Sequence, residues 1–288
     1  MKSTILRLAA LLGPVCLASA QSPATQTLSP SDKNAARTAA PISVPVNQLL
    51  TPAGIQVELP GLRPQVIALS PDGSLLVTSG KTPELVVIDP RNGNILQRVP
   101  LPSGQGPETP GEVSEFILKP DKGGQASYNG LIFSADGKRI LLSNVAGSIK
   151  VFAVQPDRKV VPAQSIKLPK SGLSQHESDV PAGLALSPDG ERLYVVLNLS
   201  NRLLEMETHT GKTLRIFDVG VAPYAVALAR DKAYVSNWGG RRPDEQSPVG
   251  PAGQGTTVRV DPVRAIASEG TVSIVDVIGF PLFPLVLV

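Results

Sequence analysis

The chain has 288 residues and a formal net charge of +3 at pH 7, with 18% charged and only 4% aromatic residues. Its basic residues are dispersed and are not interleaved with aromatic residues, which argues against nucleic acid as a partner. The one cysteine, Cys16, lies in an apolar leader, so the rest of the chain offers no disulfide framework, zinc–thiolate site or cysteine nucleophile.

The first twenty residues have the pattern of a secretory signal peptide. Lys2 and Arg7 give a basic start, an apolar run extends to Leu17, and Ala18-Ser19-Ala20 is a small-residue cleavage site. Because the run is short for a spanning helix, we expect export to the periplasm or the extracellular space, with no membrane span after cleavage. Retention of the leader as an uncleaved anchor is the alternative.

Residues 21–50 are rich in Ser, Thr, Ala and Pro and have little patterned apolar content. This composition predicts a disordered linker. Residues 51–277 then form the folded part, in which Val, Leu and Ile must supply most of the core because aromatic residues are few.

Four segments of the folded part share one pattern of short apolar strands separated by tight turns. They are residues 64–102, 129–169, 181–220, and 223–240 continued at 271–277. No stretch keeps an apolar period of 3.6 residues over three turns, so we expect very little helix. Units of about 40 residues with four antiparallel strands predict the blades of an all-β propeller.

The turn residues support this division into strands. Ser70-Pro71-Asp72-Gly73 and Ser187-Pro188-Asp189-Gly190 place Pro where φ is fixed and Gly where φ can be positive, as a hairpin requires. Asn92-Gly93 and Thr210-Gly211 have the same role between the third and fourth strands.

Long connections interrupt the repeats at residues 103–127, 170–180 and 239–270. The connection before a blade's first strand and the one between its second and third strands leave from the same face. All three segments are therefore predicted to lie on one face of the propeller, opposite the tight turns. A face that gathers the long loops is the expected place for a small-molecule or protein ligand.

The repeats resemble the YVTN family of seven-bladed β-propellers. The segment Ser236-Asn237-Trp238-Gly239-Gly240-Arg241, with the Gly- and Pro-rich insertion that follows, is similar to the propeller half of exported bacterial proteins in which a propeller precedes an alkaline-phosphatase-like phosphoesterase domain. The resemblance covers residues 51–277 and implies a binding or scaffold role beside a catalytic domain. The metal-binding residues of that domain would lie downstream, so none is carried onto this chain.

The resemblance implies seven blades, of which we expect four here. Residues 54–60 read as a lone outer strand that would complete the last blade. The apolar tail at residues 278–288 fits neither pattern. A frameshift or premature end, an outer strand of the fourth blade, and a true hydrophobic tail are the three explanations. An unclosed arc of blades would also associate through its exposed edges.

Three polar residues in the segment 170–180 form the first group of candidates. His176, beside Glu177 and Asp179, could ligate a metal or act as a general base, and a solvated loop histidine is the alternative. His209 lies in a tight turn on the other face and is expected to be structural.

The second group of candidates surrounds the only tryptophan. Trp238 could be a stacking platform at the channel mouth or could cap the packing between two blades. Arg241 and Arg242 suit an anionic ligand, and the nearby Asp244 and Glu245 could instead pair with them.

These observations predict an exported β-propeller that binds a ligand or partner and belongs to a propeller–phosphoesterase protein. We identify no catalytic residue, metal site or cofactor site in this chain. The alternative is a lactonase-like hydrolase, for which Glu177, Asp179 and Asn198 are the candidate residues at the channel mouth.

Overall fold

The computed structural model describes residues 42–44, 48–50, 53–104, 121–174, 176–253 and 255–277. These residues contain no helix, and so none that is long and apolar enough to cross a membrane. The chain divides into two units, Met1–Ile55 and Gln56–Val288. In the first unit, β1 (Ile42–Val44) pairs with β2 (Gln48–Leu50), so the predicted linker contains a short hairpin. The predicted signal peptide and the apolar tail lie outside the described residues.

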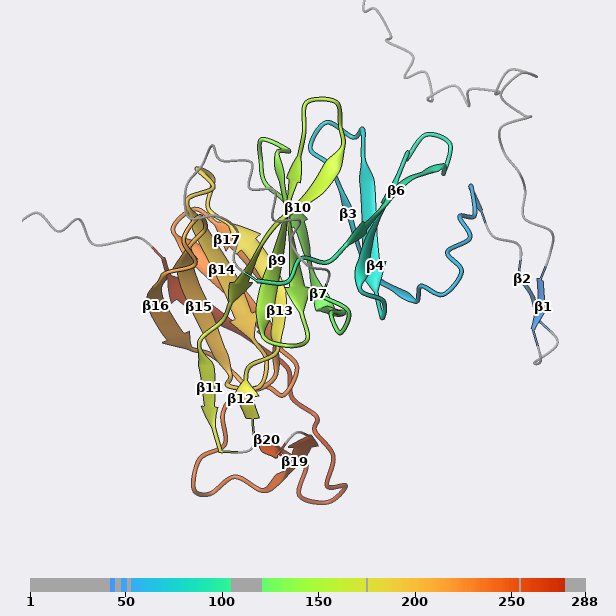
Figure 1. Cartoon of the computed structure of the whole chain (residues 1–288). Helices are drawn as coiled ribbons and strands as arrows, with labels where there is room; N and C mark the ends of the chain where they lie inside the picture. The colour runs from blue at the N-terminus through green and yellow to red at the C-terminus, as the bar shows by residue number, and fades with distance from the viewer. Residues whose placement is uncertain are drawn as a thin grey trace, which may run out of the picture. The chain divides into compact units, whose positions relative to one another are not determined.

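The repeats fold as antiparallel sheets, which we call blades 1 to 4 in chain order (Figure 1). Blade 1 comprises β3 (Pro64–Leu69), β4 (Leu76–Gly80), β5 (Glu84–Ile88) and β6 (Ile95–Pro100). Blade 2 comprises β7 (Ala126–Phe133), β8 (Arg139–Asn144), β9 (Ser148–Val154) and β10 (Val160–Lys167). Blade 3 comprises β13 (Pro181–Leu186), β14 (Arg192–Leu197), β15 (Arg202–Glu207) and β16 (Thr213–Asp218). Within the described residues blade 4 has three strands, β17 (Pro223–Ala229), β18 (Lys232–Asn237) and β21 (Thr271–Asp276).

The Ser-x-Asp-Gly turns join the first two strands of blades 1 to 3, as predicted. In blade 1 the Ser70 hydroxyl donates to Asp72 Oδ1 at 2.6 Å, and the Gly73 N–H donates to the Ser70 carbonyl at 2.9 Å. Gly73 has φ of 69°, a conformation that glycine adopts without steric cost. The same bonds recur at Ser134-Asp136 and Ser187-Asp189, so a local sequence signal fixes the register of each first hairpin.

The blades stack face to face through their innermost strands. β7 contacts β3 on one side and β13 on the other, and β13 also contacts β17. A separate apolar cluster fills each of the three interfaces between neighbouring blades. Four-stranded antiparallel blades that stack in this way make the fold an all-β propeller, as predicted.

Two glycines allow the innermost strands to approach closely. A Cβ on Gly130 of β7 would lie 2.1 Å from the carbonyl oxygen of Ala182 in β13. A Cβ on Gly183 of β13 would lie 2.7 Å from the Cα of Ala225 in β17. At both positions a side chain would collide with the backbone of the next blade.

The prediction of an outer strand at residues 54–60 is wrong, because this segment has no strand structure. Val57, Leu59 and Leu62 instead pack against Val86 and Ile88, on the face of blade 1 that does not meet blade 2. These side chains therefore pack against blade 1 without forming a strand.

The long connections contain hairpins of their own. β11 (Lys170–Leu173) pairs with β12 (His176–Ser178), and β19 (Val249–Gly253) pairs with β20 (Thr256–Arg259). Both hairpins lie at the same end of the blades, below them in Figure 1, as predicted for one loop-bearing face. Of the third connection, residues 105–120 lie outside the described part of the chain.

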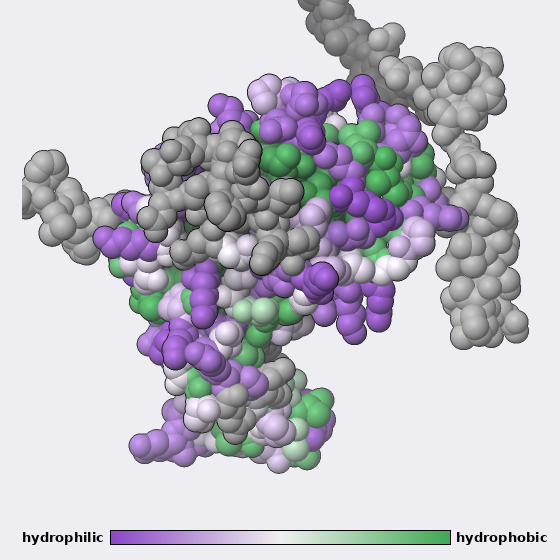
Figure 2. All heavy atoms as spheres, in the orientation of Figure 1, coloured by the Kyte–Doolittle hydropathy of each residue, from purple (hydrophilic) through white to green (hydrophobic). Residues whose placement is uncertain are grey.

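Hydrophilic residues cover most of the described surface visible in Figure 2, and apolar residues also reach the surface in the area that blade 1 occupies. Apolar side chains are exposed at the two ends of the blade series. They are Ile67 and Leu69 in blade 1, and Val272 and Ile274 in blade 4.

Candidate functional site

Two equivalent positions in each blade meet at the loop-bearing end, and we call them the rim. One is the residue before the first strand, and the other is the residue after the second strand. A backbone N–H···O bond joins them in blades 2, 3 and 4, with lengths of 3.0–3.1 Å. From blade 1 to blade 4 the rim pairs are Arg63 and Lys81, Gln125 and Val145, Val180 and Asn198, and Ala222 and Trp238.

An aromatic cluster formed by Tyr128, Tyr224 and Trp238 lies at this rim. The rings of Tyr224 and Trp238 are stacked, with centroids 4.1 Å apart and an interplanar angle of 16°. The Tyr128 ring meets Tyr224 edge to face at 5.8 Å. Trp238 is 64% exposed and Tyr128 is 40% exposed, so a large apolar surface faces solvent at this point. Trp238 thus stacks on a ring of its own blade while most of its surface stays exposed.

A bulge in β7 places Tyr128 in the cluster. Between the pairs Ala126–Asn144 and Leu131–Leu142, β7 has four residues where β8 has one. Tyr128 has φ of 47°, a left-handed conformation that is rare for a bulky side chain. Backbone strain of this kind is often found at binding sites.

Asn198 connects the cluster across three blades. It follows β14 in blade 3, and its Oδ1 accepts a hydrogen bond from the Tyr128 hydroxyl of blade 2 at 3.1 Å. Its Nδ2 donates to the Pro223 carbonyl of blade 4 at 2.8 Å. Partial burial, and to a smaller extent the neighbouring Tyr224, raise the pKa of Tyr128, so its hydroxyl keeps its proton at neutral pH.

The residues predicted around His176 do not join the rim cluster. Glu177 forms an exposed ion pair with Lys170 at 3.0 Å across the β11–β12 hairpin. Asp179 is fully buried, and its Oδ1 accepts hydrogen bonds from the backbone N–H groups of Val180 and Leu199 at 2.9 and 3.1 Å. Asp179 thus holds the start of β13 to the connection that follows β14.

The two predicted arginines are engaged by the insertion and by blade 3. Arg241 pairs with Glu269 at 3.4 Å. Arg242 donates to the Val219 carbonyl at 2.8 Å and to Asp218 at 3.0 Å. Their carboxylate partners are therefore Glu269 and Asp218 rather than the adjacent acids.

Among the predicted residues, the structure brings Asn198 and Trp238 together at the rim. Tyr128 and Tyr224, which complete the cluster, were not among the predicted residues, and neither were Arg63 and Lys81. Alignment of the repeats places Lys81 and Trp238 at the same position, directly after the second strand. That alignment could have found the rim from the sequence. The described residues contain no group of three or more His, Cys, Asp or Glu side chains that could hold a metal ion.

No protein-family profile matches the chain, and no curated protein sequence matches it. Solved structures similar to it include hydrazine synthase of Kuenenia stuttgartiensis, with 19% identity over 65% of this chain and 45% of that chain, at a TM-score of 0.45. They also include U3-55K and the WD40 repeats of RRP9, each with 15% identity over 63% of this chain and a TM-score of 0.45. The matches span 47% and 49% of those two chains, so this chain spans about half the length of each solved structure.

Proposed function

We propose that this chain is an exported β-propeller domain that binds a ligand with a flat ring at its rim. The observation that carries the proposal is the exposure of Trp238 while its other face stacks on Tyr224. The rings are held by backbone and side-chain bonds, so a ligand would meet a platform that is already ordered. Stacking on such rings contributes about 0.5–1.5 kcal/mol beyond the burial of area.

We also propose that the domain is the front part of a propeller–phosphoesterase protein with about seven blades. The motif at residues 236–241, with its insertion, supports the link to that class. The apolar side chains exposed at the two ends of the blade series, such as Ile67 and Ile274, support further blades that would cover them.

The contacts at the rim favour binding over hydrolysis. The lactonase-like alternative requires Glu177 and Asp179 beside Asn198. Glu177 is paired with Lys170 in the hairpin, and Asp179 is fully buried with its Oδ1 bonded to backbone N–H groups. No described contact brings either acid to the Asn198 side chain.

Titration with a neutral ring compound tests the proposed binding site. Benzyl alcohol is the probe, and the emission of Trp238, the only tryptophan in the chain, is the signal. We expect saturable binding at millimolar concentration, weakened at least fivefold by Tyr224→Ala, because that change removes the ring that supports Trp238. The matched control is Tyr234→Ala, since Tyr234 is also exposed but lies in β18 outside the rim. No saturable change, or equal loss in both variants, would contradict the proposal.

A further inference from the structure

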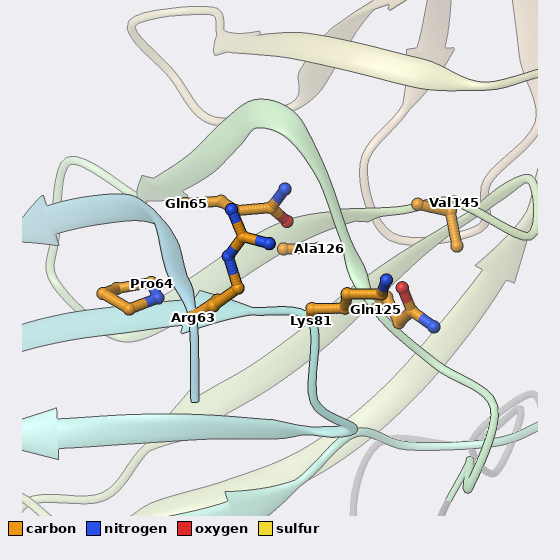
Figure 3. A pocket seen from close by; sticks show the side chains of 7 residues that line it. All are labelled: Arg63, Pro64, Gln65, Lys81, Gln125, Ala126 and Val145. Atoms are coloured by element: carbon orange, nitrogen blue, oxygen red, sulfur yellow. The ribbon is translucent and has the colours of Figure 1, made fainter. Parts of the chain in front are cut away.

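A pocket lies between the rim positions of blades 1 and 2, where the first residue of β7, Ala126, forms part of its lining. Its volume is about 380 Å³, and its lining includes Arg63, Gln65, Lys81 and Gln125 (Figure 3). The lining therefore offers two cations and two amides and no carboxylate. A set of donors with two positive charges is suited to an oxyanion.

Neither cation has a carboxylate partner among the residues that the structure describes. Most of the described arginines pair with an acid, as Arg98 does with Glu84 and Arg259 with Glu269. Arg63 and Lys81 are exposed and form no such pair within that part of the chain. Within the described residues, no neighbouring acid neutralises these two charges.

The backbone around the pocket is fixed. The Gln125 N–H donates to Asn144 Oδ1 at 2.9 Å, and the Val145 N–H donates to the Gln125 carbonyl at 3.1 Å. On the side of blade 1, a Cβ on Gly80 would lie 1.7 Å from the Arg63 carbonyl oxygen. Only a glycine allows Arg63 to pass so close to the end of β4. The cations thus extend from an ordered rim and not from free loops.

The pocket and the aromatic cluster share the start of β7. Ala126 lines the pocket and Tyr128 belongs to the cluster, so their Cα atoms are at most about 7 Å apart. Tyr128 does not itself line the pocket, so a ligand that touches both must extend out of the pocket along the start of β7.

We propose that the ligand of the rim carries an oxyanion, carboxylate or phosphate, which binds to Arg63 and Lys81 while its ring lies against Tyr128. This inference rests on the proposed ring-binding function and adds the charge of the ligand. Arg63 supplies a planar pair of N–H donors, and Lys81 supplies a second positive charge. The glutamine amides provide further donors to the same group.

Calorimetric titration of the whole chain with benzoate, phenyl phosphate and benzyl alcohol tests this assignment. We expect each anion to bind at least tenfold more tightly than the neutral alcohol, with an affinity that falls as salt rises, because the site is exposed. The tighter of benzoate and phenyl phosphate identifies the oxyanion.

Paired variants identify the cations. The double variant that combines Arg63→Gln and Lys81→Gln should weaken anion binding at least tenfold and leave the binding of benzyl alcohol unchanged. Arg63→Lys should fall between that variant and the original chain, because it keeps the charge and loses the planar fork. The matched control, Lys138→Gln with Lys212→Gln, removes two exposed charges from the opposite, tight-turn face and should have no effect.

The outcomes separate this inference from the function on which it rests. Equal affinity for benzoate and benzyl alcohol, or equal loss in the two paired variants, would overturn the oxyanion site and leave the ring site standing. Anion binding that depends on Arg63 and Lys81 but is insensitive to Tyr128→Leu would contradict the ring contact and leave the oxyanion site.

Discussion

Replacing Gly130 with alanine would place a methyl group where blade 2 touches blade 3. A Cβ there would lie 2.1 Å from both the Ala182 carbonyl oxygen and the Ser143 Oγ, where ordinary contact begins at 3.4 Å. The Ser143 hydroxyl already donates to that carbonyl at 2.7 Å, so the methyl group would separate two bonded groups. The two blades would have to move apart.

The expected destabilisation follows from three contributions. Overpacking of a buried contact costs about 1–3 kcal/mol. Loss of the hydrogen bond between Ser143 and Ala182 costs about 1 kcal/mol more. Alanine also lowers the conformational entropy of the unfolded chain, which offsets about 0.4–1 kcal/mol of this destabilisation. We therefore expect Gly130→Ala to lower the free energy of unfolding by about 1–4 kcal/mol, with a central value near 2 kcal/mol.

Urea unfolding followed by Trp238 emission measures this change. With a slope of about 2–3 kcal/mol per molar urea, the midpoint should fall by about 1 M. The control is Gly123→Ala, since the nearest atom to a Cβ there is Asp121 Oδ1 at 3.8 Å. We expect that variant to stay within about 0.5 kcal/mol of the original. An unchanged midpoint for Gly130→Ala would refute close packing of the innermost strands.

Three further predictions concern single side chains. Glu205 is fully buried and accepts hydrogen bonds from Arg192 and Arg215. Glu205→Gln should therefore lower the free energy of unfolding, measured in urea, by about 2–3 kcal/mol. This loss is smaller than that for a fully buried ion pair, because both arginines are partly exposed. The Ser70 hydroxyl and then the Ser74 N–H hold the pKa of Asp72 at about 2, so stability should fall as pH drops from about 4 towards 2, and a Ser70→Ala variant should show a shallower fall in its midpoint over that range. The pKa of Tyr128 is raised instead, so the folded chain favours the protonated hydroxyl. Stability should therefore fall as pH rises above 10, and Tyr128→Phe should lose less stability over the same alkaline titration.

The parts of the fold that the sequence predicted depend on local chemistry. Ser70-Pro71-Asp72-Gly73 closes its own turn through bonds between neighbours, and the strands on each side follow from it. The segment at residues 54–60 was misread because a strand needs a partner elsewhere. Its apolar residues Val57 and Leu59 instead pack against Val86 and Ile88 on one face of blade 1.

The proposed binding site depends on contacts that no single repeat encodes. Tyr128 contacts Tyr224 because β7 has a bulge in which Tyr128 adopts a positive φ. A tyrosine in the sequence does not predict this backbone conformation. Asn198 bonds to both neighbouring blades, and this follows from the radial stacking of three blades. Trp238 was identified because a lone tryptophan stands out in the sequence, whereas Lys81 at the equivalent position does not.

Acrylamide quenching of Trp238, with and without saturating benzyl alcohol, tests the central claim most directly. Because the ring is exposed at the rim and is the only tryptophan, we predict efficient quenching of the free chain and clear protection when benzyl alcohol is bound. A tryptophan already shielded in the free chain, or one quenched equally with benzyl alcohol bound, would contradict a ligand site at the aromatic cluster.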